Sequence, residues 1–97
     1  MTKAKRVANK IQKQFPNIKG INTCNFWDGN DNVIHLGDAA EGGMIDKDRA
    51  ADYYAFEYDP KEEVYQLGVH LKLVAALEKE GYFAEWYDCG TLLACQL

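Results

Sequence analysis

Residues 91–97 read TLLACQL and are apolar on both of the faces that a strand would present. A strand of this kind is buried on both sides, so it must lie inside a sheet or under a helix. The preceding residues, YFAEWYDCG, supply a second strand and a turn at Cys89-Gly90. Residues 82–97 are therefore predicted to form a hairpin that closes a larger sheet.

Two segments have the apolar spacing of amphipathic helices. The first is apolar at Ala4, Val7, Ala8, Ile11 and Phe15. It is predicted to end at Phe15, because a residue that precedes a proline avoids the helical region. The second segment, residues 69–80, is apolar at Val69, Leu73, Val74 and Leu77. Gly81 occupies the position of its C-terminal cap.

The middle of the chain contains further strand and turn signals. Residues 20–37 are predicted to form a hairpin with its turn at residues 28–32, where Asp-Gly and Asn tolerate left-handed backbone. Residues 38–45 resemble a loop, and residues 46–52 are predicted to form about two turns of helix. YYAFEY at residues 53–58 alternates like a strand, with Tyr54, Phe56 and Tyr58 on one face.

Residues 59–63, DPKEE, allow two interpretations. The favoured one is a hairpin loop that leads into a strand at VYQL. In the other, Asp59 caps a short helix with Pro60 at its first position. Together these elements predict an α+β fold: an antiparallel sheet of about five to six strands with two main helices packed on one side.

The length of 97 residues predicts a single compact domain, 1–97. No apolar run approaches 18 residues, and the basic first 15 residues lack the apolar core of a signal peptide, so we expect a cytoplasmic protein with no membrane contact. An odd set of cysteines without a secretion signal favours reduced thiols; these are Cys24, Cys89 and Cys95.

Known catalytic and metal-binding motifs are missing from the sequence. The Asp28-x-Asn30-x-Asn32 run begins like a calcium loop, but the positions that need Gly and Glu hold Val33 and Ala39. No CxxC or HxxxH pair supports a zinc site, and no glycine pattern supports a phosphate-binding loop. We predict no catalytic residues, no metal site and no cofactor; a hydrolase or metal enzyme that uses Cys or His is a less favoured alternative.

Charge is distributed unevenly along the chain. Residues 1–27 carry six cations and no acid, whereas residues 28–63 carry eleven acids and three cations, a net charge of −8. The simpler interpretation of the acidic block is solubility, because Asp is favoured in turns. The sharper one is a surface of carboxylates that imitates a nucleic-acid backbone and binds a basic groove. The predicted partner-binding residues are Asp28, Asp31, Asp38, Glu41, Asp46 and Asp48.

A small acidic α+β chain with carboxylate-rich loops and no enzyme motif resembles the phage-encoded anti-CRISPR proteins, particularly inhibitors of type I surveillance complexes. The resemblance is general and covers the whole chain without a diagnostic motif. It implies a non-catalytic inhibitor that mimics DNA and blocks the binding of target duplex. The partner would be a basic nucleic-acid-binding protein or complex, with nucleic acid only as a competitor.

The basic first helix departs from an all-acidic mimic and supports a different function. Its cations could contact phosphates or an anionic lipid surface, and contact with phosphates would make the chain a small nucleic-acid-binding protein; they are Lys3, Lys5, Arg6, Lys10 and Lys13. The simpler interpretation is a solvated helix face. The aromatic residues of the closing hairpin could stack on bases, but packing explains them better; they are Tyr82, Phe83, Trp86 and Tyr87.

Overall fold

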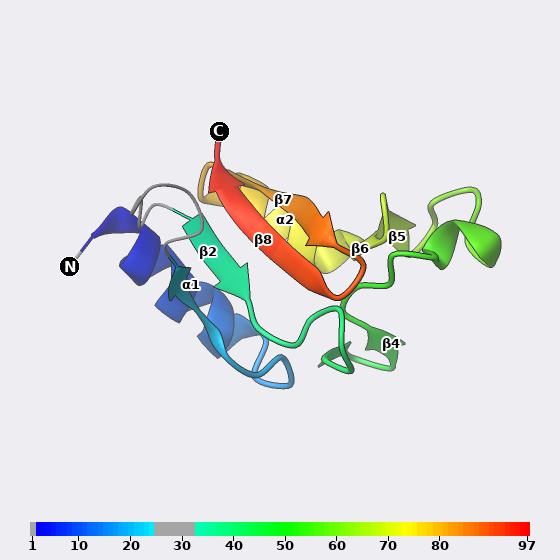
Figure 1. Cartoon of the computed structure of the whole chain (residues 1–97), viewed down its shortest axis with the longest axis horizontal. Coiled ribbons are helices and arrows are strands. Elements are labelled where there is room, and N and C mark those ends of the chain that lie inside the picture. The colour runs from blue at the N-terminus through cyan, green and yellow to red at the C-terminus, as the bar shows by residue number, and fades with distance from the viewer. Residues whose placement is uncertain (1, 25–32) are drawn as a thin grey trace.

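The computed structural model of the chain describes residues 2–24 and 33–97. Within them, two helices lie on the same face of a four-stranded antiparallel sheet, which confirms the predicted α+β fold (Figure 1). The strand order is β1-β2-β8-β7. These elements are α1 (Lys3–Gln14), β1 (Ile21–Cys24), β2 (Val33–Leu36), α2 (Leu71–Lys79), β7 (Tyr82–Asp88) and β8 (Thr91–Gln96).

Helix α1 forms where its apolar spacing predicts it. The Thr2 hydroxyl oxygen accepts the Lys5 N–H at 3.1 Å and caps the first turn. The apolar stripe is buried against the sheet; it consists of Ala4, Val7, Ala8 and Ile11. The Gln12 side chain fastens the end of the helix, because its Oε1 accepts the Ile21 N–H at 3.0 Å while its Nε2 donates to the Phe15 carbonyl at 3.2 Å.

The closing hairpin is also confirmed, with β7 and β8 paired in antiparallel register. Strand β8 lies between β2 and β7, as its two apolar faces predict, and Leu92, Leu93 and Ala94 are almost fully buried. Strands β1 and β2 pair antiparallel, in agreement with the predicted hairpin at residues 20–37. The turn predicted at residues 28–32 lies outside the described residues.

The remaining four strands do not join the main sheet. They form two small sheets of two strands each: β3 (Met44–Ile45) with β4 (Asp48–Arg49), and β5 (Tyr65–Gln66) with β6 (Val69–His70). Both small hairpins lie toward the end of the molecule opposite α1 (Figure 1).

Three local predictions are wrong. Residues 46–52 are not helical, because Asp46 and Lys47 form the turn between β3 and β4 and Asp46 has a φ of 55°. Residues 53–58 are not a strand but turns around a 3-10 helix, Ala55–Glu57. Helix α2 begins at Leu71 rather than at residue 69, because His70 caps it: the His70 Nδ1 accepts the Lys72 N–H at 3.1 Å.

One hydrophobic cluster connects both helices with the sheet. Its largest fully buried members come from every layer and include Ile11, Leu36, Leu73, Leu77 and Tyr82. Across residues 2–24 and 33–97, neither helix has the length and apolar character required to span a bilayer.

Candidate protein-binding surface

Residues 52–68 form a projection at one end of the molecule, which we call the distal lobe (Figure 1). Its two ends meet, because the Asp52 N–H donates to the Gly68 carbonyl at 2.7 Å. Immediately beside this contact, Ala51 pairs with Val69 in an antiparallel bridge, and both residues are buried. The lobe is therefore held at its base by the core while the residues between extend outward.

The Asp59 carboxylate organises the returning half of the lobe. It accepts the backbone N–H groups of Glu63 at 3.0 Å, Val64 at 3.0 Å and Tyr65 at 2.8 Å. These bonds, that to Tyr65 most of all, hold the pKa of Asp59 below its usual range, because they stabilise the ionised form. Residues 59–63 are thus a turn closed by a side chain. They lead into a strand within VYQL, as the favoured interpretation predicts, but that strand pairs with Val69–His70 and not with residues 53–58.

A second carboxylate, Asp52, organises the outgoing half. Its Oδ2 accepts the Tyr58 hydroxyl at 2.6 Å, and its Oδ1 accepts the Tyr54 N–H at 3.0 Å. The Arg49 guanidinium lies 3.7 Å from the same Oδ2. The Tyr58 hydrogen bond is the main reason that the pKa of Asp52 is lowered. Asp52 therefore fixes the 3-10 turn that carries the aromatic residues.

The outer surface of the lobe is aromatic. Four consecutive aromatic residues of the sequence have exposed side chains: Tyr53, Tyr54, Phe56 and Tyr58. Tyr53 and Tyr54 contact each other edge to face, with ring centroids 5.3 Å apart, and Tyr54 contacts the tilted ring of Phe56 at 6.4 Å. Tyr53 continues this contact to Trp86 of β7, again at 5.3 Å. Phe56 is 64% exposed, so most of its ring is available to a partner.

A concavity of about 440 Å³ lies between the lobe and β7. Its apolar walls are Tyr53, Phe56, Pro60, Tyr65, Leu67 and Trp86. The carboxyl-bearing residues at its margin are Asp59 and Glu62. The site therefore combines apolar walls with two carboxyl-bearing residues whose oxygens accept backbone N–H groups, and apolar walls with few polar groups are typical of a surface that accepts a side chain from a protein partner.

Leu67 stands at the tip of the β5–β6 hairpin beside this concavity. It is 79% exposed and has a φ of 50°, a left-handed conformation that leucine rarely adopts. Its backbone is held from both sides: the Trp86 indole N–H donates to the Leu67 carbonyl at 2.8 Å, and the Leu67 N–H donates to the Glu62 carboxylate at 2.8 Å. Strain that presents an apolar side chain to solvent is typical of a contact residue.

The lobe is acidic as well as aromatic. Residues 52–68 contain five acids and one cation, a net charge of −4 that equals the net charge of the whole chain. Within the described residues, Glu57 and Glu63 have exposed carboxylates that form no ion pair. These two groups can pair with the cations of a partner.

The six acids predicted as partner-binding residues fall in different surroundings. Asp28 and Asp31 lie outside the described residues. Asp38 is half-buried in the turn after β2, where its Oδ1 accepts the Lys19 N–H at 2.8 Å, and Glu41 is exposed in the following turn. Of the six acids, Asp46 and Asp48 lie close together, on the β3–β4 hairpin.

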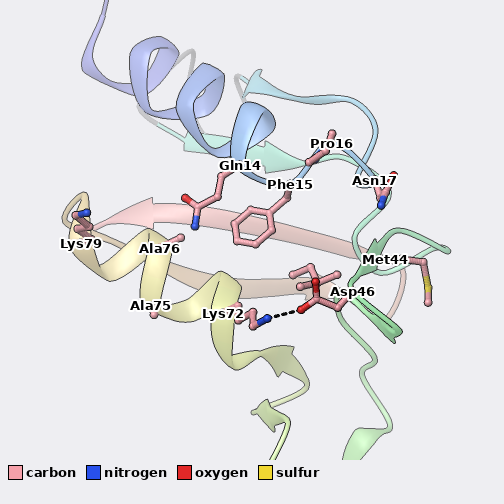
Figure 2. A pocket seen from close by; sticks show the side chains of 11 residues that line it. Gln14, Phe15, Pro16, Asn17, Met44, Asp46, Lys72, Ala75, Ala76 and Lys79 are labelled. Atoms are coloured by element: carbon pink, nitrogen blue, oxygen red, sulfur yellow. Dashed lines mark hydrogen bonds and ion pairs between the residues drawn. The ribbon is translucent and has the colours of Figure 1, made fainter.

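Asp46 and Asp48 share the β3–β4 hairpin and face the start of α2. The Lys72 ammonium donates a hydrogen bond to Asp46, which lowers the pKa of that carboxylate (Figure 2). An oxygen of Asp48 lies 3.8 Å from Nε2 of His70. Asp46 and Asp48 therefore each have a partner within the molecule, but both remain exposed and can accept an additional cation.

A wider groove of about 670 Å³ separates the end of α1 from α2 (Figure 2). The Phe15 ring points into it, and the Asp46–Lys72 pair lies at its edge. The residues that line this groove include no cysteine, serine, threonine or histidine. The charged residues that line the groove are Asp46, Lys72 and Lys79, so it could hold a ligand with polar groups.

The cysteines and histidines are dispersed through the described part of the chain. All three cysteines are free thiols, and no three His, Cys, Asp or Glu side chains among residues 2–24 and 33–97 converge on a metal-sized site. Burial and the Glu85 carboxylate, which accepts the Cys95 thiol at 3.4 Å, raise the pKa of Cys95 to about 11. That thiol stays protonated at neutral pH and is a weak nucleophile.

The aromatic part of this surface was not predicted, because the alternation in YYAFEY suggests that one face is buried. Only Ala55 is buried in that segment. The feature of the sequence that could have indicated an exposed surface is the alternation of aromatic and acidic residues immediately before Pro60. Of the aromatic residues in β7, Tyr82 is fully buried as packing predicts, whereas Trp86 contributes to the site.

Comparison with protein-family models, with curated proteins and with solved structures gives no match to this chain.

Proposed function

We propose that this chain is a non-catalytic inhibitor or adaptor that binds a basic, nucleic-acid-handling protein through its acidic middle. The observation that carries the proposal is the distal lobe, where exposed aromatic side chains and a strained, exposed leucine surround a concavity rimmed by carboxylates. Tyr, Trp and Phe anchors with a charged rim are the usual composition of a protein-binding hot spot.

The charge of the lobe favours a basic partner. Glu57 and Glu63 offer exposed carboxylates, and Asp46 and Asp48 add two more on the neighbouring hairpin. An arginine that enters the concavity would contact both the aromatic faces and the rim, which combines cation–π and ionic attraction. A lysine- or arginine-lined groove that normally binds a phosphate backbone has this chemistry, and nucleic acid would compete for it.

The lobe is also rigid enough to bind without a large ordering cost. Asp52 and Asp59 accept four backbone N–H groups and the Tyr58 hydroxyl, and the Trp86 indole N–H binds the Leu67 carbonyl at the tip of the β5–β6 hairpin. A surface whose conformation is set before binding loses less entropy on association. The general resemblance to phage anti-CRISPR inhibitors makes a type I surveillance complex the first partner to test.

The test uses a pair of matched variants. Phe56→Ser with Leu67→Ser removes two exposed apolar groups from the lobe, and Tyr87→Ser with Leu97→Ser removes two of similar exposure elsewhere. Immobilised wild type and both variants are incubated with purified surveillance complex and with bacterial lysate, and bound proteins are identified by mass spectrometry. We expect the wild type and the control to retain a basic nucleic-acid-binding protein that added duplex DNA releases, and the lobe variant to retain none.

Charge reversal supplies an independent measurement. Each of Glu57→Lys and Glu63→Lys replaces an attraction by a repulsion of about 1 kcal/mol at contact distance in water. The resulting change of about 2 kcal/mol should lower the partner's affinity about thirtyfold per reversal at low salt, with a smaller effect in concentrated salt. Equal capture by the wild type and the lobe variant, or capture only of acidic proteins, would reject the proposed function.

A further inference from the structure

The cations of α1 form a narrow stripe. At 3.6 residues per turn, Lys3, Arg6, Lys10 and Lys13 fall within an arc of about 80° and span about 15 Å along the axis. All four side chains are exposed. The fifth cation of the helix, Lys5, points elsewhere and donates to the Asn22 amide oxygen at 2.7 Å.

This arrangement costs the helix stability. Neighbours along the stripe are three or four residues apart and carry like charges, which repel. Lys3 also lies in the first turn, where the helix dipole disfavours a cation and where α1 has no acid. Lys13 lies in the last turn, where the dipole favours a cation, so the cost comes from repulsion between neighbours and from Lys3. A local cost of this kind indicates a functional reason for the charges.

Internal partners compensate only part of the stripe. Lys10 pairs with Glu80 at 3.1 Å, and the Lys3 ammonium lies 5.7 Å from the centre of the Tyr82 ring. Within residues 2–24 and 33–97, Arg6 and Lys13 form no ion pair. A surface depression of about 310 Å³ lies between these two residues, Lys10 and Glu80.

We propose that this stripe binds the phosphate backbone of a nucleic acid without regard to sequence. Regularly spaced cations on one straight face suit a polymer of regularly spaced phosphates. An anionic membrane fits less well, because surface-bound helices insert their apolar face and the apolar face of α1 is already buried against the sheet. The site goes beyond the proposed function, since it lies at the opposite end of the molecule from the distal lobe (Figure 1).

The two ends suggest a geometry for simultaneous binding. The molecule is 39 Å long, with the stripe toward one end and the distal lobe at the other. Because the lobe and nucleic acid would compete for the same groove of the partner, the stripe of a docked chain would contact only nucleic acid that lies outside that groove. The stripe's own affinity is nevertheless measurable without any partner protein.

The experiment measures fluorescence anisotropy of a labelled 20-base single strand and a 20-base-pair duplex between 50 and 200 mM salt. The stripe variant Arg6→Gln/Lys10→Gln/Lys13→Gln is compared with a control of equal net charge, Lys19→Gln/Lys47→Gln/Lys61→Gln. If all four cations contact duplex phosphates, wild-type affinity falls about a hundredfold over this range, with a log–log slope near −3.6. The magnitude of this slope should decrease by about 2.7 in the stripe variant, and the slope of the control should equal that of the wild type.

Several outcomes would overturn the proposal: no oligonucleotide binding by the wild type, equal loss in both variants, or binding to phosphatidylserine vesicles in place of oligonucleotides. Sedimentation at low salt checks a further alternative, in which the stripe binds the acidic lobe of a second copy. Phe56→Ser with Leu67→Ser should bind oligonucleotides like the wild type, so failure of the stripe and failure of the proposed function are separable.

Discussion

Leu67 provides the sharpest test of the idea that the distal lobe sacrifices stability for binding. Its φ of 50° places a leucine in the left-handed region, immediately before Gly68 with a φ of 81°. Two successive positive φ values in a two-residue hairpin loop are the geometry in which an Asn-Gly pair is favoured. We therefore expect Leu67→Asn to stabilise the protein.

The magnitude follows from strain and burial. Left-handed backbone costs a non-glycine residue roughly 1–2 kcal/mol, and asparagine tolerates it better than most residues. Leu67 is 79% exposed, so truncating it removes about one fifth of the roughly 2 kcal/mol that complete burial of a leucine contributes. The net gain is about 1 kcal/mol, equivalent to a Tm increase of about 4–8 °C in a domain of this size.

The assay is thermal unfolding followed by circular dichroism, with Leu97→Asn as the control. Leu97 is 77% exposed, and its φ is not positive, so its substitution should leave Tm nearly unchanged. In the capture assay, Leu67→Asn should also weaken partner binding, because it removes an apolar contact. A Tm for Leu67→Asn that equals or falls below that of the wild type would refute the strain reasoning.

Three further predictions concern stability. The pKa of Asp59 is lowered in the fold, so its contribution is complete above about pH 4 and is lost as pH falls below that; Asp59→Asn should lower Tm at pH 7 and flatten the decline of Tm below about pH 4. Gly37→Ala should prevent folding, because its Cβ would lie 1.9 Å from the Lys19 carbonyl oxygen, whereas Gly42→Ala has a positive φ but no such clash and should lower Tm moderately; circular dichroism distinguishes them. The buried Tyr82 hydroxyl has no hydrogen-bond partner among the described residues, so Tyr82→Phe should raise the free energy of unfolding by about 1 kcal/mol in urea titration, and a loss would mean that the hydroxyl is paired.

The elements that sequence analysis predicted well are those whose burial produces a regular pattern. Helix α1 packs one stripe against the sheet, so its apolar residues recur at helical spacing. Strand β8 lies between two strands and is buried on both faces, so nearly every residue in it is apolar. In both cases the distribution of apolar residues along the sequence indicates which side of the element faces the core.

The segment from residue 46 to residue 70 could not be predicted in this way. Its strands contain only two residues each, which is too short for an alternation to be recognised. Its backbone is set instead by side chains that accept backbone N–H groups, particularly Asp52 and Asp59. Such bonds depend on where each carboxylate points, so the same letters are equally compatible with a loop, a cap or a hairpin.

The predicted charge and the observed surface can be reconciled by separating two kinds of acid. Asp38, Asp52 and Asp59 accept backbone N–H groups, so reversing their charge would disrupt turns as well as remove negative charge. Glu57 and Glu63 make no such bonds with their carboxylates within the described residues, so their reversal changes only the surface potential. Loss of binding therefore supports recognition by charge only when reversal of Glu57 or Glu63 causes it and the Tm of the variant is unchanged. Part of the concentration of acids in the middle of the chain thus has a local structural cause, and Glu57 and Glu63, which remain available to a partner, belong to the same lobe as the exposed aromatic residues.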